Sequence, residues 1–197
     1  MPSMRVLADE QKVASLIEGL ATVIRQDMQH RHEQGPWALV GIRSRGDVLA
    51  ERLARMLRPD YVGTLDLTLY RDDLSEIGPQ AIVRTTEIPF KVDGVNVVLV
   101  DDVLMTGRSV RAALQSLMDL GRPKRVWLAV LVDRGGRELP ITPDHVAVDL
   151  TAEVHGAPQT DELVNVCLRP TDDRDAIIVV ALEDLEPGHA IGKTDGG

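Results

Sequence analysis

Cysteine is almost absent from this sequence, and aromatic residues are scarce. The single cysteine, Cys167, allows neither an internal disulfide bond nor a cysteine-based metal cluster, which fits a protein of the reducing cytoplasm. Aromatic residues make up 3% of the chain, so few rings are available to stack on unpaired nucleic-acid bases. An excess of positive charge is also missing, because the net charge is -9. Binding to nucleic acid would therefore need a local basic patch.

Long apolar runs and metal-ligand motifs are missing as well. No apolar stretch approaches the roughly 20 residues of a membrane-spanning helix, and the first residues lack the apolar segment of a signal peptide. We therefore expect no membrane partner and a cytoplasmic location. The five histidines do not have the spacing of zinc ligands, which argues against a zinc site.

The chain has enough apolar residues, 44% of 197, for one domain with a substantial core. Apolar residues at helical spacing predict helices over residues 9–32, 48–57 and 109–120. Short apolar or alternating runs predict strands over residues 37–42, 62–70, 95–102, 124–133, 146–150, 163–168 and 177–182. This alternation predicts an α/β fold with three layers and a mostly parallel sheet. We expect a single domain over residues 1–185 and a loose tail over 186–197.

The stretch "VVLVDDVLMTGRSV" (residues 97–110) carries the chemistry. Asp101 and Asp102 end a buried strand and suit vicinal hydroxyls, because charged acceptors form strong hydrogen bonds. Next comes a turn with Gly107 that leads into a helix, where backbone N–H groups and the hydroxyls of Thr106 and Ser109 suit an anion. The stretch therefore predicts a site for a ribose 5-phosphate. Taken alone, the two aspartates could also be a solvated strand end with one capping residue.

Two other phosphate-binding patterns do not match this stretch. The loop of nucleoside triphosphatases requires a lysine after its last glycine, and no G-x-G-x-x-G fingerprint of dinucleotide sites is present. Instead, the stretch resembles the phosphoribosyl pyrophosphate (PRPP) motif of type I phosphoribosyltransferases, which is an apolar strand, two acids and a T-G-x-S/T turn. The resemblance implies their fold, with Asp101 and Asp102 on the ribose 2- and 3-hydroxyls and residues 106–109 on the 5-phosphate. The PRPP-binding segment that it implies consists of Asp101, Asp102, Val103, Leu104, Met105, Thr106, Gly107, Arg108 and Ser109.

A second stretch, "VGIRSRGDVLAERLA" (residues 40–54), resembles the diphosphate-binding loop of the same family. Arg43, Ser44 and Arg45 precede a helix N-terminus, and paired guanidinium groups suit a leaving diphosphate. Type I enzymes often hold a non-proline cis peptide in this loop, so the resemblance implies one next to Ser44. It also implies that Arg45 acts in catalysis together with Asp101 and Asp102. The alternative is a pair of solvated arginines at a helix start.

Two more stretches narrow the resemblance to the pyrimidine operon attenuator (PyrR) family, whose members are also uracil phosphoribosyltransferases. They are "LDLTLYRDDLSEIG" (residues 65–78) and "DLGRPKRVWLAVLVDRGGRELPI" (residues 119–141). By resemblance, residues 65–92 form a flexible hood in which Arg84 reaches the diphosphate, and Asp133 and Arg134 lie on the base side. Purine enzymes of this type place an aspartate where this chain has Met105, so a pyrimidine is favoured.

The reaction implied by the resemblance transfers ribose 5-phosphate from PRPP to N1 of uracil and yields UMP and diphosphate. Mg²⁺ is the implied cofactor, held mainly through PRPP rather than directly by protein ligands. A homodimer or higher homo-oligomer is implied as well. Two alternatives remain open at this stage: a UMP-sensing regulator of transcription attenuation with little catalysis, and a purine salvage enzyme, against which Met105 argues.

The resemblance weakens where the attenuators bind messenger RNA. Gly136 stands in place of a histidine and Thr142 in place of an arginine. On the first helix, where the family carries basic residues, this chain has Glu18, Gly19, Thr22 and Asp27. Each lost phosphate contact lowers the salt-dependent affinity, so RNA is expected to bind weakly or not at all. Outside these motifs, the acidic residues 172–175 are predicted to lie in a turn and Cys167 to be a buried small apolar residue.

Overall fold

The computed structural model describes residues 4–30, 35–67, 86–151 and 162–181. Its main sheet has five parallel strands in the order β3-β2-β4-β5-β6. The strands are β2 (Trp37–Ile42), β3 (Tyr61–Leu65), β4 (Asn96–Leu104), β5 (Arg125–Asp133) and β6 (His145–Asp149). β4 and β5 lie in the middle of the sheet and read as nearly continuous apolar runs, because they are covered on both faces.

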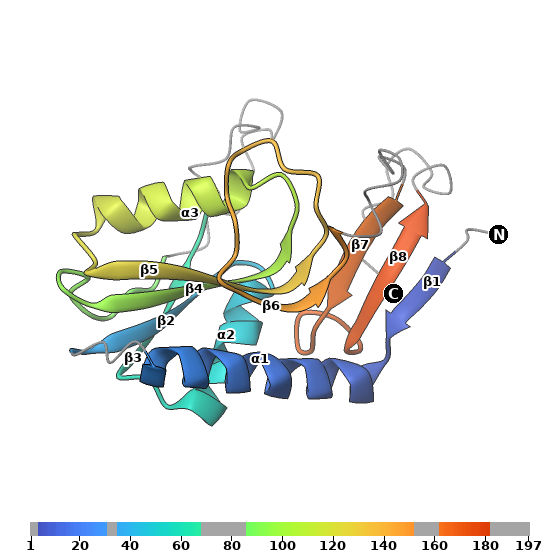
Figure 1. Cartoon of the computed structure of the whole chain (residues 1–197), viewed down its shortest axis with the longest axis horizontal. Coiled ribbons are helices and arrows are strands. Elements are labelled where there is room, and N and C mark those ends of the chain that lie inside the picture. Colours follow the sequence, from blue (N-terminus) through green and yellow to red (C-terminus); the bar gives the residue numbers. More distant parts are fainter. Residues whose placement is uncertain (1–3, 31–34, 68–85, 152–161, 182–197) are drawn as a thin grey trace, which may run out of the picture.

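Helices cover both faces of this sheet, as Figure 1 shows. α1 (Glu10–His30) and α2 (Gly46–Leu57) pack on one face, against Val98 and Val100 of β4. α3 (Arg108–Asp119) packs on the other face, against Val97 and Leu99 of the same strand. The predicted three-layer α/β fold with a mostly parallel sheet is therefore confirmed. No helix in the described part of the chain is both long and apolar enough to cross a membrane.

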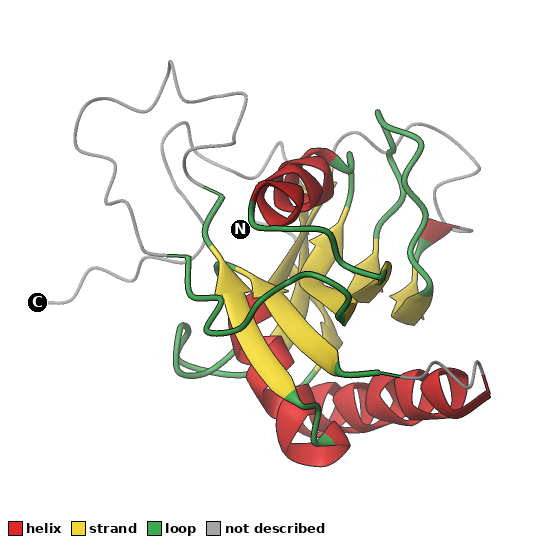
Figure 2. Cartoon of the chain, turned by 90° about the vertical axis from the view of Figure 1, so that its left-hand side faces the viewer, coloured by secondary structure: helices red, strands yellow, loops and turns green. Residues whose placement is uncertain are grey.

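A second, smaller sheet stands beside the main one, which the sequence pattern did not predict (Figures 1 and 2). It is antiparallel, with the order β1-β8-β7, and consists of β1 (Met4–Ala8), β7 (Glu162–Cys167) and β8 (Ala176–Ala181). β1 is only five residues long and pairs with β8, so the local sequence has no apolar pattern that predicts a strand there. Cys167 lies in this sheet and is buried, as predicted.

The boundaries of several elements differ from the predictions. α1 begins at Glu10 because the carboxylate of Asp9 accepts a hydrogen bond of 2.9 Å from the Lys12 N–H and so caps the helix. α2 begins at Gly46, before the predicted Val48. β3 ends at Leu65, and the remainder of the strand predicted over residues 62–70 falls partly outside the described residues. The tail predicted over residues 186–197 lies outside them too, as does most of the predicted hood.

Candidate active site

The turn that carries Arg43, Ser44 and Arg45 lies between β2 and α2, at the carboxyl end of the sheet. Its Arg43–Ser44 peptide is cis, as the resemblance implied, and Arg45 has a φ of 75°. The turn lies tightly against neighbouring backbone, because a Cβ on Gly46 would be 2.6 Å from the Val100 carbonyl oxygen of β4. Only glycine at position 46 therefore allows the arginines to approach the end of β4 this closely.

Asp101 and Asp102 lie side by side in β4, opposite that turn. Asp101 is buried, and its carboxylate accepts a hydrogen bond of 3.0 Å from the Asp102 backbone N–H. Burial, and then the charge of Asp102, raise the pKa of Asp101 well above its ordinary value. Burial also raises the pKa of Asp102, although the positive charge of Arg45 opposes the shift. The pair is thus an acidic site in which a cationic or hydroxyl-bearing ligand would favour ionisation.

A hollow of about 250 Å³ joins the two motifs. Its lining comprises Ile42, Arg43, Ser44, Arg45, Asp66, Leu67, Asp101, Asp102, Val103 and Ser109. Residues far apart in the sequence meet here because β2 and β4 are parallel neighbours and their carboxyl ends lie at one edge. The structure therefore brings together the predicted diphosphate loop, the paired acids and the first turn of α3.

The segment from Met105 to Gly107 connects β4 to α3, whose first two residues are Arg108 and Ser109. Gly107, the residue before the helix, has a φ of 88°, a conformation that residues with a side chain rarely adopt. The Thr106 hydroxyl accepts a hydrogen bond of 3.2 Å from the Arg108 N–H, which shapes the turn. Arg108 also forms an ion pair of 2.7 Å with Glu138, and both side chains are about half exposed. The turn and the start of α3 thus form an N-terminal helix site of the kind that suits a phosphate.

Arg137 binds the backbone at the start of this segment, a role that no sequence motif indicated. Its guanidinium donates to the backbone carbonyl oxygens of Leu104 (3.3 Å) and Met105 (2.9 Å). It also donates to Asp133 Oδ2 at 2.6 Å, from a position four residues along the chain. Arg137 is part of the stretch "DRGGRELP", but spacing along the chain does not predict its contacts with Leu104 at the end of β4 and with Met105 after it.

Asp133 and Arg134 occupy different places. Asp133 lines a second cavity, of about 480 Å³, with Gly136 and Ile141 among its neighbours. Its carboxylate also accepts a hydrogen bond of 2.9 Å from the Gly135 N–H. The Arg134 guanidinium instead donates to the Glu162 carbonyl oxygen in β7, and burial lowers the pKa of Arg134. The base-side role of both residues stays a prediction.

Asp172 is a second residue whose contact with the site no sequence motif indicated. The predicted turn over residues 172–175 lies between β7 and β8, and two of its carboxylates bind arginines at the start of α2 and within it. Both Asp172 carboxylate oxygens accept hydrogen bonds from Arg45, each 2.8 Å long. The two residues are 127 positions apart, so no local pattern could predict the contact.

Arg84 and residues 68–85 of the predicted hood lie outside the described residues. The segment that follows them is attached to β3. Thr64 and Glu87 form an antiparallel bridge, and the Asp66 N–H donates to the Thr86 hydroxyl at 3.1 Å. Both ends of the predicted hood are thus anchored next to the hollow that Asp66 lines.

Comparisons with known proteins bear on the family and on the fold of this chain. A model of the phosphoribosyl transferase domain family matches residues 5–162. A Bifunctional protein PyrR from Pelotomaculum thermopropionicum is 46% identical over 166 residues, which covers 82% of this chain and 88% of the relative. Another, from Deinococcus deserti, is 52% identical over 154 residues, which covers 76% of this chain and 81% of the relative. A solved structure of the hypoxanthine phosphoribosyl transferase from Trypanosoma cruzi has a TM-score of 0.63 over 90% of each chain; at 18% identity, this similarity concerns the fold alone.

Proposed function

Because this chain belongs to the PyrR family of phosphoribosyltransferases, we propose that it transfers ribose 5-phosphate from PRPP to N1 of uracil. The bond from the anomeric carbon to N1 forms, the bond to the diphosphate breaks, and the N1 proton is released with the diphosphate. The observation that carries this proposal is the hollow in which Asp101 and Asp102 face the turn with Arg43 and Arg45. An acidic wall for a ribose and a cationic wall for a diphosphate are what PRPP needs.

The reaction separates charge along the bond from the anomeric carbon to the diphosphate. Positive charge develops on the ribose, beside the carboxylates of Asp101 and Asp102, while negative charge develops on the leaving oxygens, beside Arg43 and Arg45. Fixed charges placed where charge develops stabilise the transition state more than the ground state. The N-terminus of α3 and the hydroxyls of Thr106 and Ser109 would hold the 5-phosphate during the transfer.

Mg²⁺ fits this site through the chemistry of its donors. The carboxylates of Asp66, Asp101 and Asp102 line the hollow, but no three His, Cys, Asp or Glu side chains of the described residues are placed to hold a metal ion by themselves. Because Mg²⁺ prefers oxygen ligands, the oxygens of PRPP would have to supply most of them. A nearby dication would lower the raised pKa values of Asp101 and Asp102 and so favour their ionised forms. The ion would be held mainly by PRPP oxygens, with these carboxylates around it, and it would neutralise charge on the diphosphate.

The methionine at position 105 favours a pyrimidine over a purine as the substrate base. This residue is 37% exposed and lies beside Gly136, at the position where purine enzymes of this type have an aspartate. A thioether cannot exchange a proton with a purine nitrogen, so a purine would lose that interaction. Competition by hypoxanthine or guanine, but not by uracil, would contradict this part of the proposal.

The direct test is a steady-state assay of the purified chain with uracil, PRPP and Mg²⁺. We expect formation of UMP and diphosphate, and we expect turnover to stop when a chelator removes Mg²⁺. Binding of UMP without turnover would instead identify a nucleotide sensor with little catalysis and would contradict the enzyme assignment.

Pyrimidine leader RNA is expected to bind weakly or not at all at physiological salt. The exposed positions Glu18, Gly19 and Thr22 of α1 carry no positive charge, and exposed positions 136 and 142 are Gly and Thr. Filter binding of a leader transcript, with and without UMP, measures the affinity. The double variant Glu18→Arg, Thr142→Arg should bind more tightly and with a steeper salt dependence, since each added phosphate contact contributes. Tight, UMP-dependent binding by the unaltered chain would contradict the prediction.

A further inference from the structure

Asp172 binds the arginine that the proposed function assigns to the diphosphate. Arg45 Nε and Nη2 donate to Asp172 Oδ2 and Oδ1, each at 2.8 Å. The side chains are only 19% and 7% exposed, so solvent screens this pair little. Two parallel hydrogen bonds between planar groups fix the orientation of the guanidinium as well as its position.

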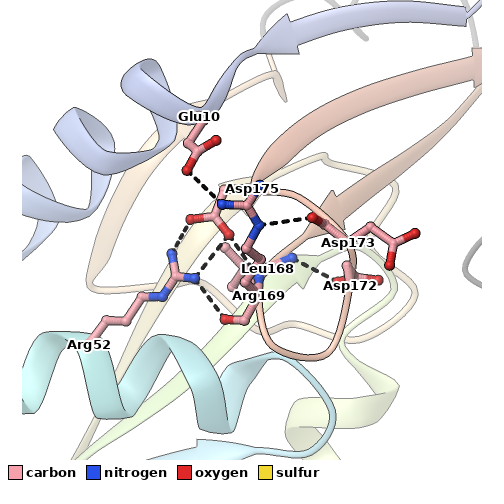
Figure 3. Close-up of polar contacts among 7 residues, drawn as sticks. All are labelled: Glu10, Arg52, Leu168, Arg169, Asp172, Asp173 and Asp175. Atoms are coloured by element: carbon pink, nitrogen blue, oxygen red, sulfur yellow. Dashed lines mark hydrogen bonds and ion pairs between the residues drawn. The ribbon is translucent and has the colours of Figure 1, made fainter.

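The carboxylate of Asp172 is itself fixed by the turn from which it comes. The Leu168 N–H donates to Asp172 Oδ2 at 2.7 Å, and the Asp172 N–H donates to the Leu168 carbonyl oxygen at 3.0 Å. Figure 3 shows this turn with the Leu168–Asp172 contact at one side and Arg52 at the other. Asp172 therefore belongs to a rigid loop rather than to a free surface.

A second carboxylate attaches the same turn to α2. Asp175 accepts hydrogen bonds from Arg52 Nη1 (2.5 Å) and Nη2 (2.9 Å), and from the Arg169 N–H (2.8 Å) (Figure 3). Arg52 lies on α2, outside the lining of the hollow, whereas Arg45 precedes α2 and lines it. The turn thus has two similar anchors, of which only Asp172 contacts the site.

Charge favours a lasting pair between Asp172 and Arg45. Burial alone would raise the pKa of Asp172, but the hydrogen bonds from Arg45 and from the Leu168 N–H outweigh it, so that the pKa lies below its ordinary value. The same carboxylate raises the pKa of Arg45. Both groups therefore carry full charge at neutral pH. Asp172 accepts from two of the five guanidinium N–H donors of Arg45, so this pair by itself does not use up the donor capacity of the guanidinium.

We propose that Asp172 is a positioning residue for PRPP, because it holds the Arg45 guanidinium against the hollow in the orientation that receives the diphosphate. Without it, the long side chain of Arg45 could turn toward Asp102, whose charge also acts on it. This inference rests on the proposed function. It adds a residue from beyond the stretch 5–162 that the family model matches.

The test compares Asp172→Asn, Asp172→Glu and the matched control Asp175→Asn. For Asp172→Asn we expect kcat/KM for PRPP to fall about 10- to 100-fold, since small misplacements of a positioning group cost this much. The KM for uracil should stay within about twofold. Asp172→Glu, which keeps the charge and both acceptor oxygens, should recover most of the loss. Asp175→Asn should lower the melting temperature about as much as Asp172→Asn but leave kcat/KM for PRPP within about threefold.

Three results would overturn the proposal: unchanged PRPP kinetics in Asp172→Asn, an equal kinetic loss in Asp175→Asn, or loss of folding in Asp172→Asn alone, which would indicate a structural role. Calorimetry of Mg²⁺–diphosphate binding separates this proposal from the function itself. If the unaltered chain did not convert uracil, the proposed function would fail. A diphosphate affinity that falls in Asp172→Asn but not in Asp175→Asn would still support the positioning role, and an equal affinity in both would refute it.

Discussion

Asp101→Asn is expected to lower kcat/KM for PRPP by about 10- to 150-fold. A hydrogen bond to a charged acceptor contributes about 1.5–3 kcal/mol, and the amide cannot replace the charge next to the developing cation. The steady-state assay with PRPP as the varied substrate measures this effect. Asp102→Asn should show a loss of similar size, and unchanged kinetics in both variants would remove the paired acids from the site.

The same substitution is expected to stabilise the unliganded protein at neutral pH. Burial and the charge of Asp102 hold the pKa of Asp101 well above the ordinary value of 3.8. The unfolded chain therefore ionises this group at a lower pH than the folded chain does. Its contribution is fully present below pH 3.8 and is lost as the pH rises toward the folded pKa. Asparagine does not titrate, so the free energy of unfolding of the variant does not decrease in this way as the pH rises.

Thermal denaturation between pH 4 and pH 8 measures that difference. We expect the melting temperature of Asp101→Asn to approach that of the unaltered chain near pH 4 and to exceed it increasingly at higher pH. In a domain of this size, about 1 kcal/mol corresponds to about 2–4 °C. Asp102→Asn should gain less, because Arg45 already opposes the rise in the pKa of Asp102. A pH-independent difference would contradict the explanation.

Local patterns predicted the main sheet and the central motif. β4 and β5 are buried on both faces, so each appears in the sequence as an uninterrupted apolar run. The segment from Asp101 to Ser109 is contiguous, and the topology of a parallel sheet places its turn at the carboxyl edge. The diphosphate loop follows β2, the parallel neighbour of β4, and therefore meets the motif.

Local sequence patterns did not predict contacts between residues that are far apart in the chain. Asp172 looks like part of an ordinary acidic turn until β7 and β8 place it against Arg45. β1 pairs with β8, and position 46 requires glycine because it lies against the Val100 carbonyl oxygen of β4. In each case the decisive partner lies in another element, and spacing along one stretch contains no information about it.

Arg137→Met is expected to destabilise the fold most among single changes around the site. The side chain donates to the Asp133 carboxylate and to the carbonyl oxygens of Leu104, Met105 and Ile141. Methionine retains the apolar part but leaves the Asp133 side chain, only 8% exposed, without this cation. Removing one partner of such a largely buried network costs about 2–4 kcal/mol. The melting temperature should fall by about 4–16 °C.

Glu138→Gln is the matched control for Arg137→Met, because Glu138 joins the same two segments through Arg108. That ion pair is about half exposed on both sides, and exposed pairs contribute about 0–1 kcal/mol. The control should therefore lower the melting temperature by at most about 4 °C. Arg137→Met should also raise the KM for PRPP, since the carbonyl oxygens of Leu104 and Met105 that it releases precede the phosphate-binding turn. Equal melting temperatures in the two variants would contradict the prediction, because the largely buried contacts of Arg137 would then contribute no more than the exposed pair of Arg108 and Glu138.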